Sequence, residues 1–316
     1  MKAIIYDQNN VTYPLVYGDA VQPLPKDFEV LVSVKTVSMN AADYRSMKLK
    51  AIPKRKIFGS DIAGIVEGIG NKVTKFKIGD EVCGDISGSG LGGFAEYTVA
   101  SENALVLKPK NVSFETASAT PMSAVTALQG LRNKGNIQVG QRVLIYGAGG
   151  GVGTFAVQLA KYFGAHVSAV CGSNNVESVK SLGADQVINY HETDITKSNA
   201  RYDLVLVVNG NNPLPDYKRL LAKMGRCVMV GGSLSQVIKT MLFGSVLSLG
   251  SKKMCLLNAK PNAEDLEFIM KLVEEGKVKP VIDRRYPLSE TPEAMRYLSK
   301  GHVRGKVIIE IDNKTD

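Results

Sequence analysis

The sequence predicts an α/β fold in which a β-barrel-like lobe is interrupted by a doubly wound parallel-sheet domain. A glycine-rich turn near residue 150 stands between a strand-like run and a helix-like run. Strand-like runs separated by Gly, Pro and Asp turns come before it, and strands with helical spacers come after it. The 316 residues also exceed one typical domain. We therefore expect one domain of residues 1–122 plus 261–316 and a second of residues 123–260.

The segment Arg142–Gly172 predicts a dinucleotide-binding unit. Arg142–Tyr146 is a short apolar run with β-branched members, as in a buried parallel strand. The next seven residues read GAGGGVG, and apolar residues then recur at helical spacing until Gly164. His166–Val170 predicts the second strand. Glycines let the backbone approach a pyrophosphate, and the helix N-terminus offers unpaired N–H groups to its charge.

The turn departs from the G-x-G-x-x-G fingerprint at one position. Aligned on the last glycine, its three positions are Ala148, Gly150 and Gly153, so alanine stands first. A tight turn in another kind of α/β protein is the alternative, but both strands and the helix stand where the fingerprint requires them. The expected cofactor contacts in the turn are Ala148, Gly149, Gly150, Gly151, Val152 and Gly153.

The residues after the second strand favour NADP(H) over NAD(H). NAD-binding units place there an acid that bonds the ribose 2′-hydroxyl, whereas this chain has Gly172, Ser173, Asn174 and Asn175. An acid would repel a 2′-phosphate by about 4 kcal/mol at 4 Å with an effective dielectric of 20. The small polar side chains can instead donate hydrogen bonds. No Lys or Arg stands in this stretch, and we expect Tyr190, which ends the third strand, to assist.

Composition and charge exclude several other classes. The net charge is +9, but no Lys/Arg block is interleaved with aromatics, so we expect no nucleic-acid partner. Basic faces around an anionic cofactor explain this charge. The four scattered cysteines fit reduced thiols, and no apolar run is long enough for a signal peptide or a membrane span. We therefore expect a cytoplasmic protein without a membrane span.

The remaining periodicity completes the predicted architecture. In the first domain the expected strands are Ala3–Tyr6, Glu29–Val37, Ile62–Ile69, Glu81–Ile86 and Phe94–Val99, followed by a helix at Ser113–Thr126. In the second, Gln186–Asn189, Asp203–Val208, Cys227–Val230 and Met254–Leu257 bring the strands to the six of a full doubly wound sheet. After a helix at Ala263–Glu275, the tail from Val281 to Ile311 is expected to rejoin the first domain.

Several segments then match one family in its own order. They are NAADYR, GSDIAGIVEGIG, FKIGDEV, GGFAEY, SAVTAL, YGAGGGVG, LGADQVINY, KPVIDRRYPL and GHVRGKVII, running from Asn40 to Ile309. With them the chain resembles the medium-chain dehydrogenase/reductase superfamily, in its zinc-free quinone oxidoreductase (zeta-crystallin-like) branch. The resemblance implies a GroES-like catalytic domain, an inserted Rossmann domain and a homodimer.

The ligands that zinc needs are not grouped in the sequence. Zinc-dependent relatives carry Gly-His-Glu where this chain has Gly59, Ser60 and Asp61. The region of their four-cysteine lobe, near residues 85–93, contains no cysteine, and all three histidines follow residue 165. We therefore expect no metal. Without a Lewis acid to polarise a carbonyl, the expected substrates are conjugated acceptors, whose conjugation spreads the developing negative charge.

The resemblance also assigns residues to the reaction. It places Asn40 near the nicotinamide, Thr126 on the carboxamide side, and Arg304 and Lys306 among the cofactor contacts. Tyr44 is the only nearby phenol able to donate a hydrogen bond to an oxyanion. The expected catalytic residues are thus Tyr44 and Asn40. For Tyr44, a packing role in the barrel is an equal alternative.

The sequence therefore predicts an NADPH-dependent oxidoreductase that transfers hydride to a quinone, an enone or an enal without zinc. Two alternatives remain open. One is a reductase of enoyl thioesters or ordinary aldehydes. The other is a non-catalytic, NADPH-responsive RNA-binding protein, which would retain RNA in a salt-sensitive manner without turnover.

Overall fold

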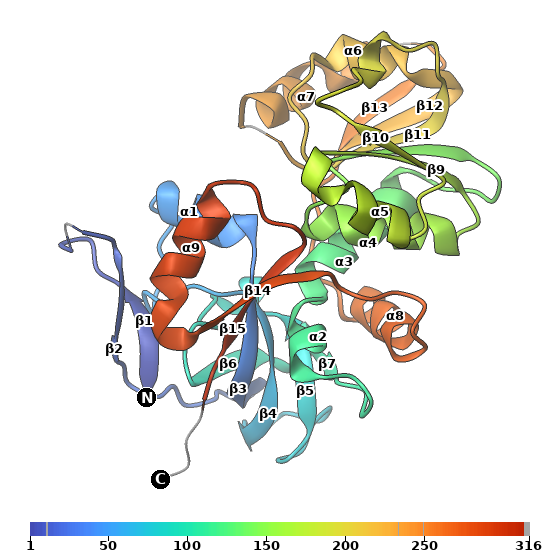
Figure 1. The fold of residues 1–316 in the computed structure, drawn as a ribbon. Helices are drawn as coiled ribbons and strands as arrows, with labels where there is room; N and C mark the ends of the chain where they lie inside the picture. Colours follow the sequence, from blue (N-terminus) through green and yellow to red (C-terminus); the bar gives the residue numbers. More distant parts are fainter. Residues whose placement is uncertain (11, 233, 249, 313–316) are drawn as a thin grey trace. The chain divides into compact units, whose positions relative to one another are not determined.

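The computed structural model describes residues 1–10, 12–232, 234–248 and 250–312. It divides into two compact units; in Figure 1 the first has the colours of both ends of the chain, blue and red, and the second has the colours of the middle, green to orange. The first unit is Met1–Ser123 with Pro261–Asp316, and the second unit is Ala124–Lys260. The second unit is thus inserted into the first, and it begins at residue 124 where the sequence suggested residue 123.

The first unit is built on a seven-stranded sheet in the order β14-β15-β3-β4-β5-β7, with β6 paired to β3. Its strands are β3 (Glu29–Met39), β4 (Asp61–Ile69), β5 (Glu81–Asp85), β6 (Tyr97–Ser101), β7 (Leu105–Leu107), β14 (Ile282–Pro287) and β15 (Lys306–Glu310). All neighbours pair antiparallel except β14 and β15. Because β15 pairs with β3, the C-terminal tail rejoins the N-terminal strands as expected.

Smaller elements complete the first unit. β1 (Lys2–Tyr6) and β2 (Leu15–Asp19) form a separate two-stranded sheet. The helices are α1 (Ala41–Lys48), α2 (Phe114–Ser118), α8 (Ala263–Glu274) and α9 (Thr291–Ser299). The single helix expected over residues 113–126 is wrong: α2 ends at Ser118 and α3 (Pro121–Leu128) starts anew. Pro121 explains the break, because its ring disfavours helical backbone at the preceding residue.

The second unit contains a six-stranded parallel sheet in the order β10-β9-β8-β11-β12-β13. Its elements are β8 (Arg142–Tyr146), α4 (Gly151–Tyr162), β9 (His166–Cys171), α5 (Val176–Ser181), β10 (Gln186–Asn189), β11 (Tyr202–Val207), α6 (Leu214–Arg219), β12 (Leu221–Met229), α7 (Leu234–Leu247) and β13 (Lys253–Leu256). When the strands are numbered along the chain from β8 as 1 to β13 as 6, they lie side by side in the sheet as 3-2-1-4-5-6. This is the doubly wound order of dinucleotide-binding domains.

Each unit has its own apolar core. In the first unit Val32, Phe58 and Phe94 are fully buried in one cluster. In the second, Val205 and Tyr217 are fully buried in another. Burying such side chains contributes about 1.5–3 kcal/mol each, so each unit is stabilised by an apolar core of its own.

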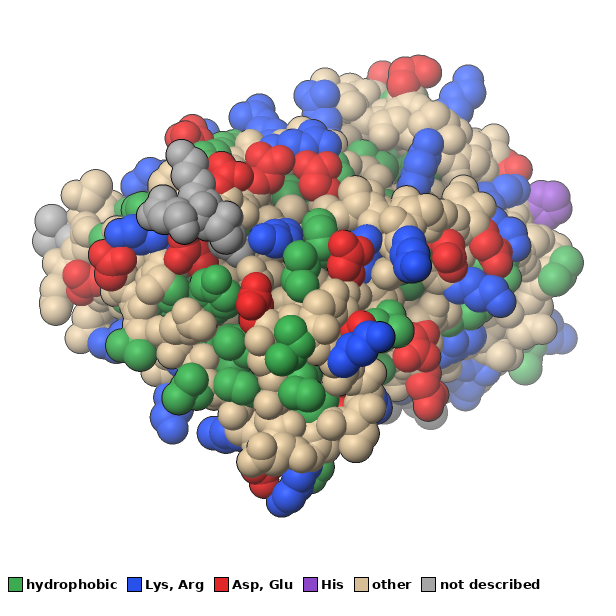
Figure 2. Space-filling view, turned by 90° about the horizontal axis from the view of Figure 1, so that it is seen from below, with side chains coloured by type: hydrophobic (Ala, Val, Ile, Leu, Met, Phe, Trp, Pro, Cys, Tyr) green, Lys and Arg blue, Asp and Glu red, His purple; other side chains and the backbone are tan. Residues whose placement is uncertain are grey.

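The surface charge is mixed in sign. On the face drawn in Figure 2, Lys and Arg side chains are interspersed with Asp and Glu, and apolar side chains gather between them. On this face the basic side chains are therefore spread rather than gathered in one stripe.

Candidate functional site

The glycine turn of the second unit packs the start of α4 directly against the end of β8. Gly147 has a φ of +88°, which L side chains rarely adopt. A Cβ on Gly153 would lie 2.2 Å from the carbonyl oxygen of Gly147 and 2.7 Å from Ala148. Only glycine therefore permits this approach of helix to turn, which is the part played by the last glycine of the fingerprint.

The N-terminus of α4 is open to a ligand. Gly150 is the N-cap residue, and it provides no side-chain hydrogen bond to the helix. The first intrahelical bond runs from the N–H of Thr154 to the oxygen of Gly150, so the preceding N–H groups have no acceptor within the helix. A Cβ on Gly150 would find its nearest atom 4.0 Å away. The turn thus fits a dinucleotide pyrophosphate, which needs close backbone approach and unpaired donors.

The residues after β9 are arranged around Gly172. A Cβ on this glycine would lie 2.9 Å from the Tyr190 hydroxyl oxygen, so a larger residue at 172 must displace the phenol. The His191 ring lies 4.4 Å from the Tyr190 ring, measured between centroids. Ser173 and Asn174 are exposed, and Asn175 lies against Gly149. The stretch expected to face the adenosine is therefore accessible at Ser173 and Asn174 and covered at Gly172.

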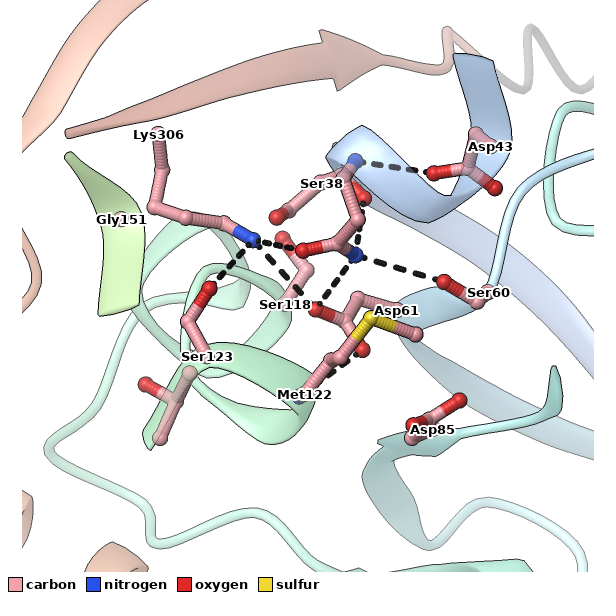
Figure 3. A network of polar contacts seen from close by, with 12 residues as sticks. Ser38, Asp43, Ser60, Asp61, Asp85, Ser118, Met122, Ser123, Gly151 and Lys306 are labelled. Atoms are coloured by element: carbon pink, nitrogen blue, oxygen red, sulfur yellow. Dashed lines mark hydrogen bonds and ion pairs between the residues drawn. The ribbon is translucent and has the colours of Figure 1, made fainter. Parts of the chain in front are cut away.

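A buried polar network occupies the first unit where β3, β4 and β15 meet α1 (Figure 3). The Nδ2 of Asn40 donates to Asp61 Oδ2 at 2.9 Å and to Ser60 Oγ at 3.3 Å. The Nζ of Lys306 donates to Asn40 Oδ1 at 2.6 Å and to Ser123 Oγ at 3.1 Å. The same ammonium lies 3.4 Å from Asp61 Oδ2, and the Asp61 and Lys306 side chains are 0% and 2% exposed.

These partners fix the orientation of the Asn40 amide. An ammonium only donates, so the atom facing Lys306 must be the amide oxygen. An ionised carboxylate only accepts, so the atom facing Asp61 must be the amide nitrogen. Asp43 adds a further restraint, because its Oδ2 accepts the backbone N–H of Asn40 at 2.8 Å and its Oδ1 accepts that of Gly59 at 3.2 Å. The network therefore holds Asn40 at the start of α1 in one rotamer.

The burial of charge perturbs the groups of this network. Burial raises the pKa of Asp43 to about 6, against the lowering effect of the Asn40 N–H and of Lys306. Burial also raises the pKa of Asp61. The ammonium of Lys306 lowers this pKa, and the carboxylate of Asp85, which lies opposite Asp61 on the neighbouring strand β5, raises it further. Burial lowers the pKa of the Lys306 ammonium, and its carboxylate neighbours oppose that shift. Only the mutual pairing of these groups makes such a charged cluster tolerable inside a protein.

The residues expected from the sequence thus fall into separate groups. Asn40 and Lys306 meet in the buried network, whereas Arg304 is exposed and its backbone N–H donates to Asp283. Tyr44 is partly buried and packs against the apolar core of the first unit. Thr126 is half-buried on α3 and belongs to the second unit.

Sequence reasoning missed several members of these groups. Asp43 and Ser123 join the buried network, and Asn189 and Glu192 join Ser173 beside the adenosine stretch. The sequence signals the last two only by a run of polar residues that starts at the last residue of β10 and continues beyond it.

The described ranges lack both a group of metal ligands and a membrane-spanning helix. Within them, no three His, Cys, Asp or Glu side chains are grouped so that they could hold a metal ion. Within the same ranges, no helix is both long enough and apolar enough to cross a membrane.

Comparison with known proteins agrees with this arrangement. Residues 26–110 match the alcohol dehydrogenase GroES-like domain family, and residues 182–309 match the zinc-binding dehydrogenase family. A chloroplast envelope quinone oxidoreductase homolog of Arabidopsis thaliana is 36% identical, over 91% of each chain. An NADPH-dependent alkenal/one oxidoreductase of the same plant is 32% identical, over 98% of this chain and 79% of that one. The structure of the quinone oxidoreductase from Coxiella burnetii superposes with a TM-score of 0.88 at 32% identity, covering 98% and 99% of the two chains.

The chain belongs to the quinone oxidoreductase-like branch of the medium-chain dehydrogenase/reductase superfamily. The predicted resemblance and fold class are confirmed, with a GroES-like unit and an inserted Rossmann sheet. The protein is an oxidoreductase that uses a nicotinamide cofactor.

Proposed function

We propose that this oxidoreductase transfers hydride from NADPH to a conjugated acceptor, a quinone or an α,β-unsaturated carbonyl, without zinc. One observation carries the zinc-free reading. Asp61 stands where zinc-dependent relatives have the Glu of Gly-His-Glu, and its Oδ2 already accepts from Asn40 and Lys306. The Ser60 hydroxyl replaces their histidine and accepts from the same amide. The oxygen atoms that could otherwise bind a metal here thus accept hydrogen bonds from the Asn40 amide and, at Asp61, from the Lys306 ammonium.

The names of similar proteins support the acceptor class. Similar sequences are named as a quinone oxidoreductase homolog and as an NADPH-dependent alkenal/one oxidoreductase. A conjugated acceptor needs no Lewis acid, since conjugation spreads the developing charge that a metal would otherwise stabilise. We extend this acceptor class to the present chain.

The proposed contacts of the cofactor are assigned within each unit separately. In the second unit, Ala148, Gly149, Gly150, Gly151, Val152 and Gly153 would bind the pyrophosphate, and Gly172, Ser173, Asn174, Asn175 and Tyr190 would surround the adenosine 2′-phosphate. The bound nicotinamide supplies the hydride. In the first unit, Asn40, whose amide has a fixed orientation, is the proposed contact of the nicotinamide. Thr126 and Arg304 stay proposed cofactor contacts.

Lys306 receives a changed role in this proposal. Its ammonium is enclosed by Asn40, Ser123 and Asp61, and its side chain is 2% exposed. A phosphate contact would require the ammonium to leave these partners. We therefore assign Lys306 to holding the Asn40 amide rather than to binding the cofactor directly.

The decisive experiment is an acceptor panel. Metal-depleted protein is mixed with NADPH or NADH and with a quinone, an alkenal, an enoyl thioester or a simple ketone, and nucleotide oxidation is followed at 340 nm. We expect turnover with quinone and alkenal, slower reaction with the ketone, and preference for NADPH. Activity that depends on added zinc, or that is confined to the thioester, would overturn the proposal. RNA retention without any turnover would favour the non-catalytic alternative.

Two further expectations belong to this proposal. We expect a homodimer in solution, which sedimentation velocity tests directly. We also expect a cytoplasmic protein. The similar plant proteins are named after the chloroplast, so imaging of the tagged full chain in its own cell is the appropriate test.

A further inference from the structure

Ser173, Asn189 and Glu192 form a polar cluster at the carboxyl edge of the parallel sheet. Asn189, the last residue of β10, pairs in register with Cys171, the last residue of β9. Its Nδ2 donates to Ser173 Oγ at 3.1 Å and to Glu192 Oε1 at 2.6 Å. The carboxyl ends of parallel strands are where open α/β sheets bind their ligands. A groove of about 270 Å³ adjoins the cluster and is lined in part by Val176, Asn189 and Glu192.

The surroundings fix the direction of the Asn189 amide. The carboxylate of Glu192 only accepts, so it requires the amide nitrogen. On the other side, the backbone N–H of His191 donates to Asn189 Oδ1 at 3.1 Å, so it requires the amide oxygen. Both restraints leave Nδ2 directed at Ser173. The reverse bond, from Ser173 Oγ to Asn189 Oδ1, is the longer one at 3.5 Å.

This direction has a consequence for the Ser173 hydroxyl. Its oxygen accepts the amide proton of Asn189 at 3.1 Å, and its own hydrogen makes the longer bond of 3.5 Å to Asn189 Oδ1, which it can exchange for an acceptor outside the cluster. A phosphate oxygen is such an acceptor, and hydrogen bonds to a charged group are roughly twice as strong as neutral ones. A 2′-hydroxyl gains less, because it offers no charge. An oriented Ser173 donor therefore distinguishes the two dinucleotides at the ribose 2′ position.

We propose that Asn189 and Glu192 are positioning residues that orient the Ser173 hydroxyl toward the 2′-phosphate of NADP(H). The inference rests on the NADPH preference proposed above. Glu192 acts in two opposing ways. Its carboxylate orients the amide, and its negative charge repels the phosphate. Because Glu192 is exposed, solvent and salt screen the repulsion, and the orienting effect dominates.

Isothermal titration of the whole protein with NADP⁺ and NAD⁺ tests this inference without turnover. The readout is the ratio of the two dissociation constants. Ser173→Ala removes the proposed hydrogen bond to the charged phosphate, so it should reduce the preference for NADP⁺ by about tenfold. Asn189→Leu and Glu192→Ala keep the Ser173 hydroxyl but remove the groups that orient it, so each should reduce the preference by a smaller factor. Glu192→Gln retains an acceptor oxygen and loses the charge, so it should keep or raise the preference. Glu177→Ala, which removes an exposed carboxylate from α5 outside the cluster, should leave the ratio unchanged.

The outcomes separate the positioning role from the cofactor assignment. Equal affinity of the unmodified protein for both nucleotides would refute the proposed NADPH preference itself. With that preference intact, an unchanged ratio in Glu192→Ala, or a loss in Glu192→Gln as large as in Glu192→Ala, would overturn the positioning role. Melting temperatures of the exposed-site variants within about 2 °C of the parent confirm that folding is not the cause, as expected for surface changes.

Discussion

The two units each hold an asparagine between a carboxylate and a donor, and they differ in how much water reaches it. In the first unit, Asn40 lies between Asp61 and the ammonium of Lys306, and all three are buried. In the second, Asn189 lies between Glu192 and a backbone N–H, and Glu192 is exposed. The hydrogen-bond chemistry is the same. We expect changes at the buried Asn40 to lower the stability of the fold and to alter the local geometry. We expect changes at the exposed cluster around Asn189 to have little effect on stability.

Solvation explains this difference. Removing one partner of a buried ion pair leaves the other charge without compensation in a medium of low dielectric. Removing an exposed partner lets water take its place, and exposed pairs contribute about 0–1 kcal/mol. A protein can therefore tune ligand choice at the exposed cluster and must preserve the buried network as a whole.

The largest effect is expected from Lys306→Met. The change leaves Asp61 buried without its cation, so the free energy of unfolding should fall by about 3–5 kcal/mol. Lys72→Met is the matched control, because Lys72 pairs with Asp27 at 2.8 Å with both side chains more than half exposed. It should cost less than about 1 kcal/mol. Urea unfolding of both variants measures the difference.

A double variant sharpens that comparison. Asp61→Asn combined with Lys306→Met removes both charges, so it should recover part of the stability lost by Lys306→Met alone. Equal losses for Lys306→Met and Lys72→Met would show that burial does not distinguish the two regions.

Tyr44→Phe tests a single phenol of the first unit. If Tyr44 donates to the oxygen that gains charge, turnover falls by about 100- to 1000-fold, corresponding to about 2.7–4 kcal/mol. NADPH affinity and the unfolding midpoint should stay nearly unchanged. Turnover of quinone and enone at the parent rate would instead assign Tyr44 to the packing that it makes against the core, with the proton supplied by water.

Alanine at two glycines of the same turn should affect different properties: protein stability at Gly153 and nucleotide affinity at Gly150. Gly153→Ala places a Cβ 2.2 Å from the Gly147 oxygen, and such overpacking costs about 1–3 kcal/mol of stability. Gly150→Ala meets nothing closer than 4.0 Å, so its cost is that of alanine at an N-cap position, about 1 kcal/mol or less. Its methyl group would still hold a pyrophosphate away from the helix N-terminus, so NADP⁺ affinity should fall by about tenfold. Unchanged nucleotide affinity in Gly150→Ala would argue against the turn as the binding site.

A dependence of stability on pH follows from the buried carboxyl group of Asp43. The pKa of Asp43 is raised from 3.8 to about 6 in the folded protein. Between these values the native state holds a proton that the unfolded chain has released, so this group's contribution to stability is lost as pH rises from about 4 to about 6. Asp43→Asn should flatten the pH dependence of unfolding in that window. A parent protein whose stability shows the same slope as Asp43→Asn would contradict the raised pKa.

The close contact between Gly172 and Tyr190 complicates a test of cofactor preference by substitution at Gly172. The absence of an acid at 172 suggests that Gly172→Asp would narrow the NADPH preference. Because the Tyr190 hydroxyl lies 2.9 Å from the added Cβ, this variant also displaces the phenol. Gly172→Ala is therefore the necessary control for the steric part, and only a further change from alanine to aspartate measures the charge.

Periodic features were predictable, and long-range polar contacts were not. The alternating strands and the glycine turn of β8 and α4 follow from local pattern, and the six-stranded order follows from the fold they imply. The bond between Lys306 and Asn40 joins residues 266 apart in the chain, so no local pattern marks it. The family resemblance placed Lys306 among the cofactor contacts, whereas folding encloses its ammonium among protein acceptors.

The adenosine side shows a second limit of sequence patterns. Asn189 and Glu192 are only three residues apart, but they lie in a polar run without periodicity. Their importance appears only when β10 is placed beside β9 and brings them to Ser173.

The transfer of deuterium tests the central claim most directly. Metal-depleted protein is incubated with NADPH carrying deuterium at C4 of the nicotinamide, on one face or the other, together with an alkenone. Mass spectrometry and NMR then locate the label in the product. We predict one deuterium at the β-carbon, from one face only, with the second hydrogen taken from water at the α-carbon. Product without deuterium would contradict direct hydride transfer, and product labelled only after zinc is added would contradict a reaction that needs no metal.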